Sequence, residues 1–177
     1  STRHAIGEVE GVELYPGTAG EKLAGYDLVI TDQEADLAIP ARVLATYGIV
    51  PEDLKSLVSI EKEPAHAIDW RRDHPLLQHV SLEDVVFSET PKYGPDVNET
   101  RIRELGYEIL ADGPHGPLIL DKTEADQLRV HTLFHPDRST IVFRVGFPVY
   151  VSNLVQGALR RAQLSEVSGG EVGGRLE

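Results

Sequence analysis

The sequence predicts a layered α/β domain built on a mostly parallel central sheet. The strand-like stretch from Asp27 to Thr31 has a block of apolar residues in place of an alternating pattern, which suits a strand covered on both faces. Strand-like segments alternate with helix-like segments, the order expected of a parallel sheet. A closing segment that starts at Phe147 places Pro148 in the first turn of a helix. At 177 residues, the chain is long enough for one well-buried domain.

The first third of the chain predicts two strands and two helices. Residues 11–17 predict a short strand that ends in a Pro-Gly turn, and an amphipathic helix from Glu21 leads into the apolar strand. The following segment predicts a helix that begins near Pro40 and ends at Gly48.

The rest of the chain predicts an antiparallel or edge portion of the sheet and a closing helix. The segment "YEILADGPHGPLILDK" predicts two strands joined by a Gly-Pro turn. The other expected elements are strands at 57–60, 84–88 and 127–134, a turn of helix at 74–80 and a polar loop at 89–100.

The composition excludes several classes of function. With 17 Lys and Arg against 29 Asp and Glu, the net charge is −12, so nucleic acid and anionic membrane surfaces would be repelled. The chain has no cysteine, which excludes a thiolate nucleophile, a disulfide and a sulfur-ligated metal site. Polar residues interrupt the apolar stretch from Ile141 to Leu159, so we expect a buried helix there and no membrane insertion.

The domain organisation is expected to be simple. We expect residues 1–163 to form a single domain. Residues 164–177 include "SGGEVGG", a composition typical of a flexible glycine-rich tail or a cloned chain end.

The segment "LFHPDRST" holds one candidate site. A strand that ends at Phe134 would deliver His135 to the carboxyl edge of the sheet, where open α/β proteins bind ligands. A catalytic histidine needs a nucleophile or a metal, and no Gly-x-Ser-x-Gly elbow is present. The favoured interpretation is structural: Asp137 or Ser139 caps a turn through its side-chain oxygen, and His135-Pro136 shapes the strand exit.

Two other polar clusters are weaker candidates. His74 and His79 are five residues apart and would diverge on a helix, so we expect no metal site there. In the structural interpretation, Asp73 caps the turn that follows it, Leu76 and Leu77 enter the core, and Trp70 anchors the loop. The acidic residues Asp32, Glu34 and Asp36 follow the apolar strand and are expected to form a solvated loop.

The segment "LFHPD" resembles the Phe-His-Pro-Glu segment of class I glutamine amidotransferases, in which the histidine and the acid belong to a Cys-His-Glu triad. By that match, His135 and Asp137 take the acid-base positions. The Gly-x-Cys-x-Gly elbow of that family has no counterpart here. The resemblance therefore implies the fold without the activity.

A second resemblance covers roughly Gly25 to Leu159. The order of "YDLVITDQEADLAIP", "IDWRRDHPLLQHVSLEDVVF", "GPLIL" and "LFHPDRSTIVFRVGFPVYVSNLV" is similar to the amidotransferase-like domain of large bacterial membrane proteins with a BatA-like aerotolerance-regulator region and a von Willebrand factor A domain. It implies a class I glutamine amidotransferase-like, flavodoxin-like sandwich with some antiparallel edge strands. The first strand of that fold is missing here unless Arg3 to Val9 supplies it.

The missing nucleophile predicts a non-catalytic domain with no cofactor or metal. The second resemblance implies an interaction or scaffolding module of a larger bacterial membrane protein, with membrane-associated protein partners. The resemblance favours the periplasmic side over the cytoplasm. The alternatives are a small-ligand or sugar-binding module with a pocket at the strand C-terminal ends, and a hydrolase with an unrecognised nucleophile or metal. No residue is predicted to be catalytic, and the candidate ligand-binding residues are His135, Asp137, His74 and Asp32.

Overall fold

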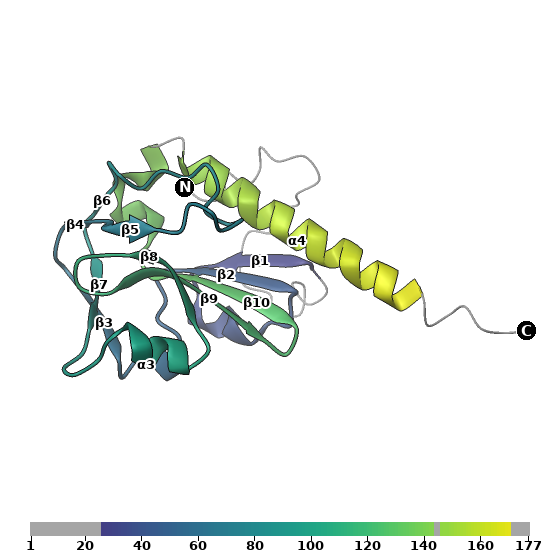
Figure 1. The fold of residues 1–177 in the computed structure, drawn as a ribbon, viewed down its shortest axis with the longest axis horizontal. Coiled ribbons are helices and arrows are strands. Elements are labelled where there is room, and N and C mark those ends of the chain that lie inside the picture. The colour runs from purple at the N-terminus through teal and green to yellow at the C-terminus, as the bar shows by residue number, and fades with distance from the viewer. Residues whose placement is uncertain (1–25, 144–145, 171–177) are drawn as a thin grey trace, which may run out of the picture.

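The computed structural model describes residues 26–143 and 146–170, and its central feature is a six-stranded sheet (Figure 1). The strands, in their order across the sheet, are β1 (Leu28–Thr31), β2 (Val43–Tyr47), β10 (Gln127–Thr132), β9 (Pro117–Glu124), β8 (Glu108–Asp112) and β5 (Asp69–Trp70). Strands β1, β2 and β10 run parallel to one another. Strands β9, β8 and β5 each pair antiparallel with the neighbouring strand, so the sheet is mixed.

This topology shows that the predicted layered α/β sandwich with a mostly parallel sheet is wrong. Two further antiparallel pairs lie outside the main sheet: β3 (Val58–Glu61) with β7 (Thr90–Tyr93), and β4 (Ala65–His66) with β6 (Val86–Phe87). The described part of the chain is therefore mainly β structure, which also overturns the amidotransferase-like and flavodoxin-like expectation. The physical reason is connection length. Strands β8, β9 and β10 follow one another through tight turns, which suit antiparallel pairing and leave no room for crossover helices.

The expected helix between Pro40 and Gly48 is instead the strand β2. All five residues of β2 are buried between β1 and β10. In a short run that is apolar throughout, no polar residues mark an exposed face. The periodicity therefore does not distinguish a buried helix from a buried strand. Gly48 ends the strand with a φ of +66°. The link from β1 contains only the short 3₁₀ helix η1 (Glu34–Ala38).

The helix α4 (Gly146–Gly170) lies across one face of the sheet (Figure 1). Its apolar side packs into the largest core cluster through Phe147, Tyr150, Val151 and Leu154, which confirms the predicted closing helix. The helix continues past Leu164, where we expected the tail to begin. No helix in the described residues has the length and apolar character needed to cross a bilayer.

The other face of the sheet carries α3 (Glu99–Glu104), as Figure 1 shows. Leu54 of η2 (Glu52–Leu54) packs in the same core cluster as Ile102 of α3. The sequence predicted a polar loop over residues 89–100, a segment that instead holds strand β7 and the start of α3. Asn98 caps this helix, because its side chain accepts a hydrogen bond of 3.3 Å from the Arg101 amide. The short helices η3 (Pro136–Arg138) and η4 (Thr140–Phe143) then link β10 to α4.

Several local predictions agree with the structure. The strands expected in the segments 57–60, 107–122 and 127–134 are present as β3, as the β8–β9 pair and as β10. The strand expected at 84–88 is reduced to the two residues of β6. The strand at 11–17 and the helix from Glu21 lie outside the described residues.

Candidate functional site

The carboxyl ends of the three parallel strands meet at one edge of the sheet. The residues that follow these ends include Asp32 after β1, Gly48 after β2 and His135 after β10. A Cβ atom on Gly48 would lie 3.2 Å from the Cβ of His135, so the histidine packs directly against the glycine backbone. The left-handed φ of Gly48 and this close approach together favour glycine at this position.

Both ring nitrogens of His135 are engaged at this edge. Nδ1 accepts a hydrogen bond of 3.2 Å from the Asp137 amide, and Nε2 lies 3.3 Å from Oδ2 of Asp32. Because Nδ1 is an acceptor, the neutral ring carries its proton on Nε2 and donates it to Asp32. Hydrogen bonds from the Gln33 side chain and from His135 lower the pKa of Asp32, so this carboxylate stays ionised.

This edge brings together three of the four predicted ligand-binding residues: Asp32, His135 and Asp137. The Asp137 carboxylate lies 3.7 Å from Nδ1 of His135. None of the described hydroxyl groups hydrogen-bonds to the ring of His135. Ser139 instead donates to the Pro136 carbonyl and accepts from the Ile141 amide, which confirms the capping role expected for it.

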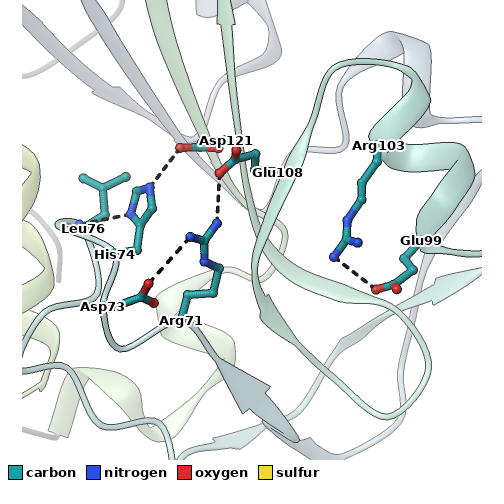
Figure 2. A network of polar contacts seen from close by, with 8 residues as sticks. All are labelled: Arg71, Asp73, His74, Leu76, Glu99, Arg103, Glu108 and Asp121. Carbon is teal, nitrogen blue, oxygen red and sulfur yellow. Dashed lines mark hydrogen bonds and ion pairs between the residues drawn. The ribbon is translucent and has the colours of Figure 1, made fainter.

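The fourth predicted residue, His74, belongs to a different cluster (Figure 2). Its Nε2 lies 3.5 Å from Oδ2 of Asp121 on β9, and its Nδ1 accepts a hydrogen bond of 3.3 Å from the Leu76 amide. No described contact joins His74 to Asp32 or His135. The pocket proposed for a small ligand or sugar, lined by all three residues, therefore loses its support.

Trp70 and the two leucines anchor the loop that carries His74 as predicted, whereas the Leu76 amide is capped by His74 and not by Asp73. The indole Nε1 of Trp70 donates a hydrogen bond of 3.1 Å to the Val80 carbonyl, and Leu76 and Leu77 are buried in the core. The side-chain amide of Asn153 on α4 donates to the carbonyls of Leu76 and Gln78. The helix thus holds the loop over the sheet.

Two carboxylates complete the His74 cluster. Glu108 on β8 lies directly opposite Asp121 on β9 in the antiparallel register. One ligand atom from each of His74, Glu108 and Asp121 lies within 4.8 Å of the others. Arg71 reaches the same cluster, with one guanidinium nitrogen 3.1 Å from Glu108 and another 3.8 Å from Asp73 (Figure 2).

Burial disfavours the charged forms of both His74 and Asp121. It lowers the pKa of His74, and the field of Arg71 lowers it further. Burial, with the nearby charge of Glu108, raises the pKa of Asp121 to about 6, although Arg71 and Arg161 oppose this shift. At neutral pH the ring is therefore neutral, and Asp121 is an ionised carboxylate in a largely buried position.

Glu108 and Asp121 were not predicted as partners of His74. They lie on two strands of a hairpin, and their pairing depends on a register that includes a bulge near Ala111. The sequence predicted the two strands and the Gly-Pro turn between them, but a turn of that length leaves the register open.

Comparisons with protein-family models, curated proteins and solved structures found no match for this chain. The function therefore has to be argued from the geometry of the residues described above.

Proposed function

We propose that this domain is a non-catalytic interaction module that binds a basic segment of a protein partner at the edge where the parallel strands end. The observation that carries the proposal is the engagement of both ring nitrogens of His135, by the Asp137 amide and by Asp32. The proposal includes the scaffolding role and the lack of catalysis that the sequence analysis predicted.

The arrangement of His135 argues against a general base. A catalytic histidine of the serine hydrolase type offers one nitrogen to a nucleophile and donates from the other to a carboxylate. Here the carboxylate of Asp32 lies at Nε2, and a backbone amide lies at Nδ1. Neither nitrogen is left to accept a proton from a substrate or a water.

The charge of this edge supports a basic partner. Four carboxylates surround it with exposed side chains: Asp32 (52%), Glu34 (64%), Glu52 (87%) and Asp137 (59%). Lys55 bridges Glu34 and Glu52 at 3.4 Å and 2.9 Å, which joins the loops that follow β1 and β2. A rigid surface rich in one sign of charge attracts the opposite sign and orients it.

Binding of a lysine- and arginine-rich peptide, measured by fluorescence anisotropy, tests the proposal. The edge variant combines Asp32→Asn, Glu34→Gln, Glu52→Gln and Asp137→Asn. We expect it to weaken binding at least about tenfold, with a loss that shrinks as salt is added.

A matched control removes the same number of charges elsewhere, at the exposed residues Glu63, Glu83, Glu99 and Glu104. We expect this control to bind the peptide nearly as well as the natural chain. Equal weakening by both variants would show non-specific attraction and contradict the proposal. So would any glutamine or ester hydrolysis that disappears in His135→Ala.

The membrane context is a further part of the proposal and comes from the sequence alone. Fractionation of cells that express the full parent protein, followed by protease access to this domain in intact spheroplasts, tests membrane association and the periplasmic side. A fully cytosolic parent protein would contradict it.

A further inference from the structure

We propose that His74, Glu108 and Asp121 form a binding site for a divalent transition-metal cation of the Zn²⁺ type. The three residues come from the loop after β5, from β8 and from β9, and their ligand atoms lie within 4.8 Å of one another (Figure 2). This inference goes beyond the proposed interaction function and does not depend on it.

Asp121 is the observation that points to a cation. The residue exposes only 9% of its surface, and the one ion pair that its carboxylate makes with the described residues is with Nε2 of His74, at 3.5 Å. That distance is long for a hydrogen bond, so the carboxylate has little compensation close by. A buried carboxylate with so little compensation is costly unless a cation neutralises it.

Glu108 adds a second negative charge at the same place. Like charges directly opposite across two strands are destabilising. Arg71 now offsets part of that repulsion through its contact of 3.1 Å with Glu108. A divalent cation between the carboxylates would neutralise both and leave Arg71 paired with Asp73.

His74 supplies a nitrogen ligand from a loop that is already fixed. A cation on Nε2 moves the ring proton to Nδ1, so the hydrogen bond from the Leu76 amide to Nδ1 is lost. The loop keeps its place because Asn153 still donates to the carbonyls of Leu76 and Gln78. The Leu76 amide is therefore a specific reporter of cation binding.

The ligand set favours Zn²⁺, Mn²⁺ or Fe²⁺ over Mg²⁺ and Ca²⁺. One imidazole nitrogen with two carboxylate oxygens suits transition metals, whereas Mg²⁺ and Ca²⁺ prefer oxygen alone. Tetrahedral Zn²⁺ at about 2.1 Å from each ligand needs ligand atoms roughly 3.4 Å apart. The Glu108 side chain is 63% exposed, so it has room to leave Arg71 and close the remaining gap, with water as a fourth ligand.

The test is isothermal titration of the EDTA-treated and desalted chain with ZnCl₂, with MgCl₂ as the comparison. We expect one equivalent of Zn²⁺ to bind and Mg²⁺ to bind at least about a hundredfold more weakly. In amide NMR spectra, the Leu76 signal should move with the same saturation curve.

Three variants remove one ligand each: His74→Gln, Glu108→Gln and Asp121→Asn. We expect each to weaken Zn²⁺ binding about a hundredfold or more, as loss of a ligand does. Arg71→Gln should have the opposite effect and tighten binding several-fold, because it removes the competing cation from Glu108. Circular dichroism on each variant shows whether it is folded.

The matched control is the exposed pair of His115 and Glu63, whose Nε2 and Oε1 atoms are 3.7 Å apart. We expect His115→Gln to leave Zn²⁺ binding unchanged. The proposal is overturned if the natural chain binds no Zn²⁺ or if the folded His74→Gln variant binds it as well as the natural chain. It is also overturned if His115→Gln weakens binding as much as His74→Gln does.

Discussion

The hydroxyl of Thr46 on β2 lies 2.7 Å from Nδ1 of His131 on β10, inside the sheet. His131 is 1% exposed, and its Nε2 has no hydrogen-bond partner among the described residues. A charged imidazolium in that position would be poorly compensated, so the folded protein keeps the ring neutral. Burial accordingly lowers the pKa of His131 from 6.5 to about 4.

This burial predicts that His131 makes the protein less stable in mild acid. The unfolded chain takes up the proton first, so the free energy of unfolding falls as pH drops from about 6.5 to about 4. The loss from this residue is at most about 3 kcal/mol. Urea unfolding at pH 7 and pH 5 should show a smaller difference for His131→Gln than for the natural chain. His115→Gln, at an exposed histidine, should show the same difference in unfolding free energy between pH 7 and pH 5 as the natural chain. The prediction is refuted if His131→Gln also shows that same difference.

Asp121→Asn should stabilise the chain in EDTA at pH 7.5. The substitution removes a buried charge and the repulsion from Glu108 while it keeps the shape of the side chain. We expect the free energy of unfolding in urea to rise by about 1–3 kcal/mol. Glu108→Gln relieves the same repulsion but loses the ion pair with Arg71, so it should change stability by less than about 1 kcal/mol. A destabilised Asp121→Asn would show that the carboxylate is satisfied without a cation.

Gly48→Ala should destabilise the edge where the parallel strands end. Gly48 has a φ of +66°, and the new methyl group would lie 3.2 Å from the Cβ of His135. We expect a loss of about 1–3 kcal/mol in the free energy of unfolding. Gly157→Ala in α4 is the control, because its nearest neighbour would be 3.9 Å away and alanine favours the helix. If Gly48→Ala were as stable as Gly157→Ala, the close packing of His135 would not hold in solution.

Asn153→Ala should loosen the loop that carries His74. The substitution removes both hydrogen bonds to the carbonyls of Leu76 and Gln78. A cost of about 1–3 kcal/mol is expected, with faster hydrogen exchange at the amides of the loop. Gln156→Ala, at an exposed position on the same helix, should change neither quantity. Equal exchange rates in the two variants would mean that packing alone holds the loop.

The comparison of sequence and structure shows which signals are local. The apolar strand before Asp32, the Gly-Pro hairpin and the closing helix at Pro148 each depend on neighbouring residues, and each is present in the structure. Strand β2 was wrongly expected to be a helix, because its burial comes from β1 and from the distant β10. That error added a helix between two expected strands and so favoured a layered α/β fold.

The residues of the candidate sites also fall into those that the sequence could predict and those that it could not. His135, Asp32 and Asp137 could be predicted as a group because residues after parallel strands converge at one edge. The partners of His74 could not, since the pairing of Glu108 with Asp121 is set by hairpin register. His131 was also missed, because only its place beside Thr46 inside the sheet makes it unusual.

The place of β10 between β2 and β9 also determines when this protein can fold during its synthesis. Thr46 and His131, which face each other across β2 and β10, are 85 residues apart in the chain. Until the ribosome has made β10, the edge of β2 that pairs with β10 has no partner strand. The β1–β2 pair then stays separate from strands β9, β8 and β5. Such an unpaired edge can join the edge of another nascent chain. We therefore expect the sheet to be completed only after β10 has been translated, and we expect chains truncated before Gln127 to aggregate.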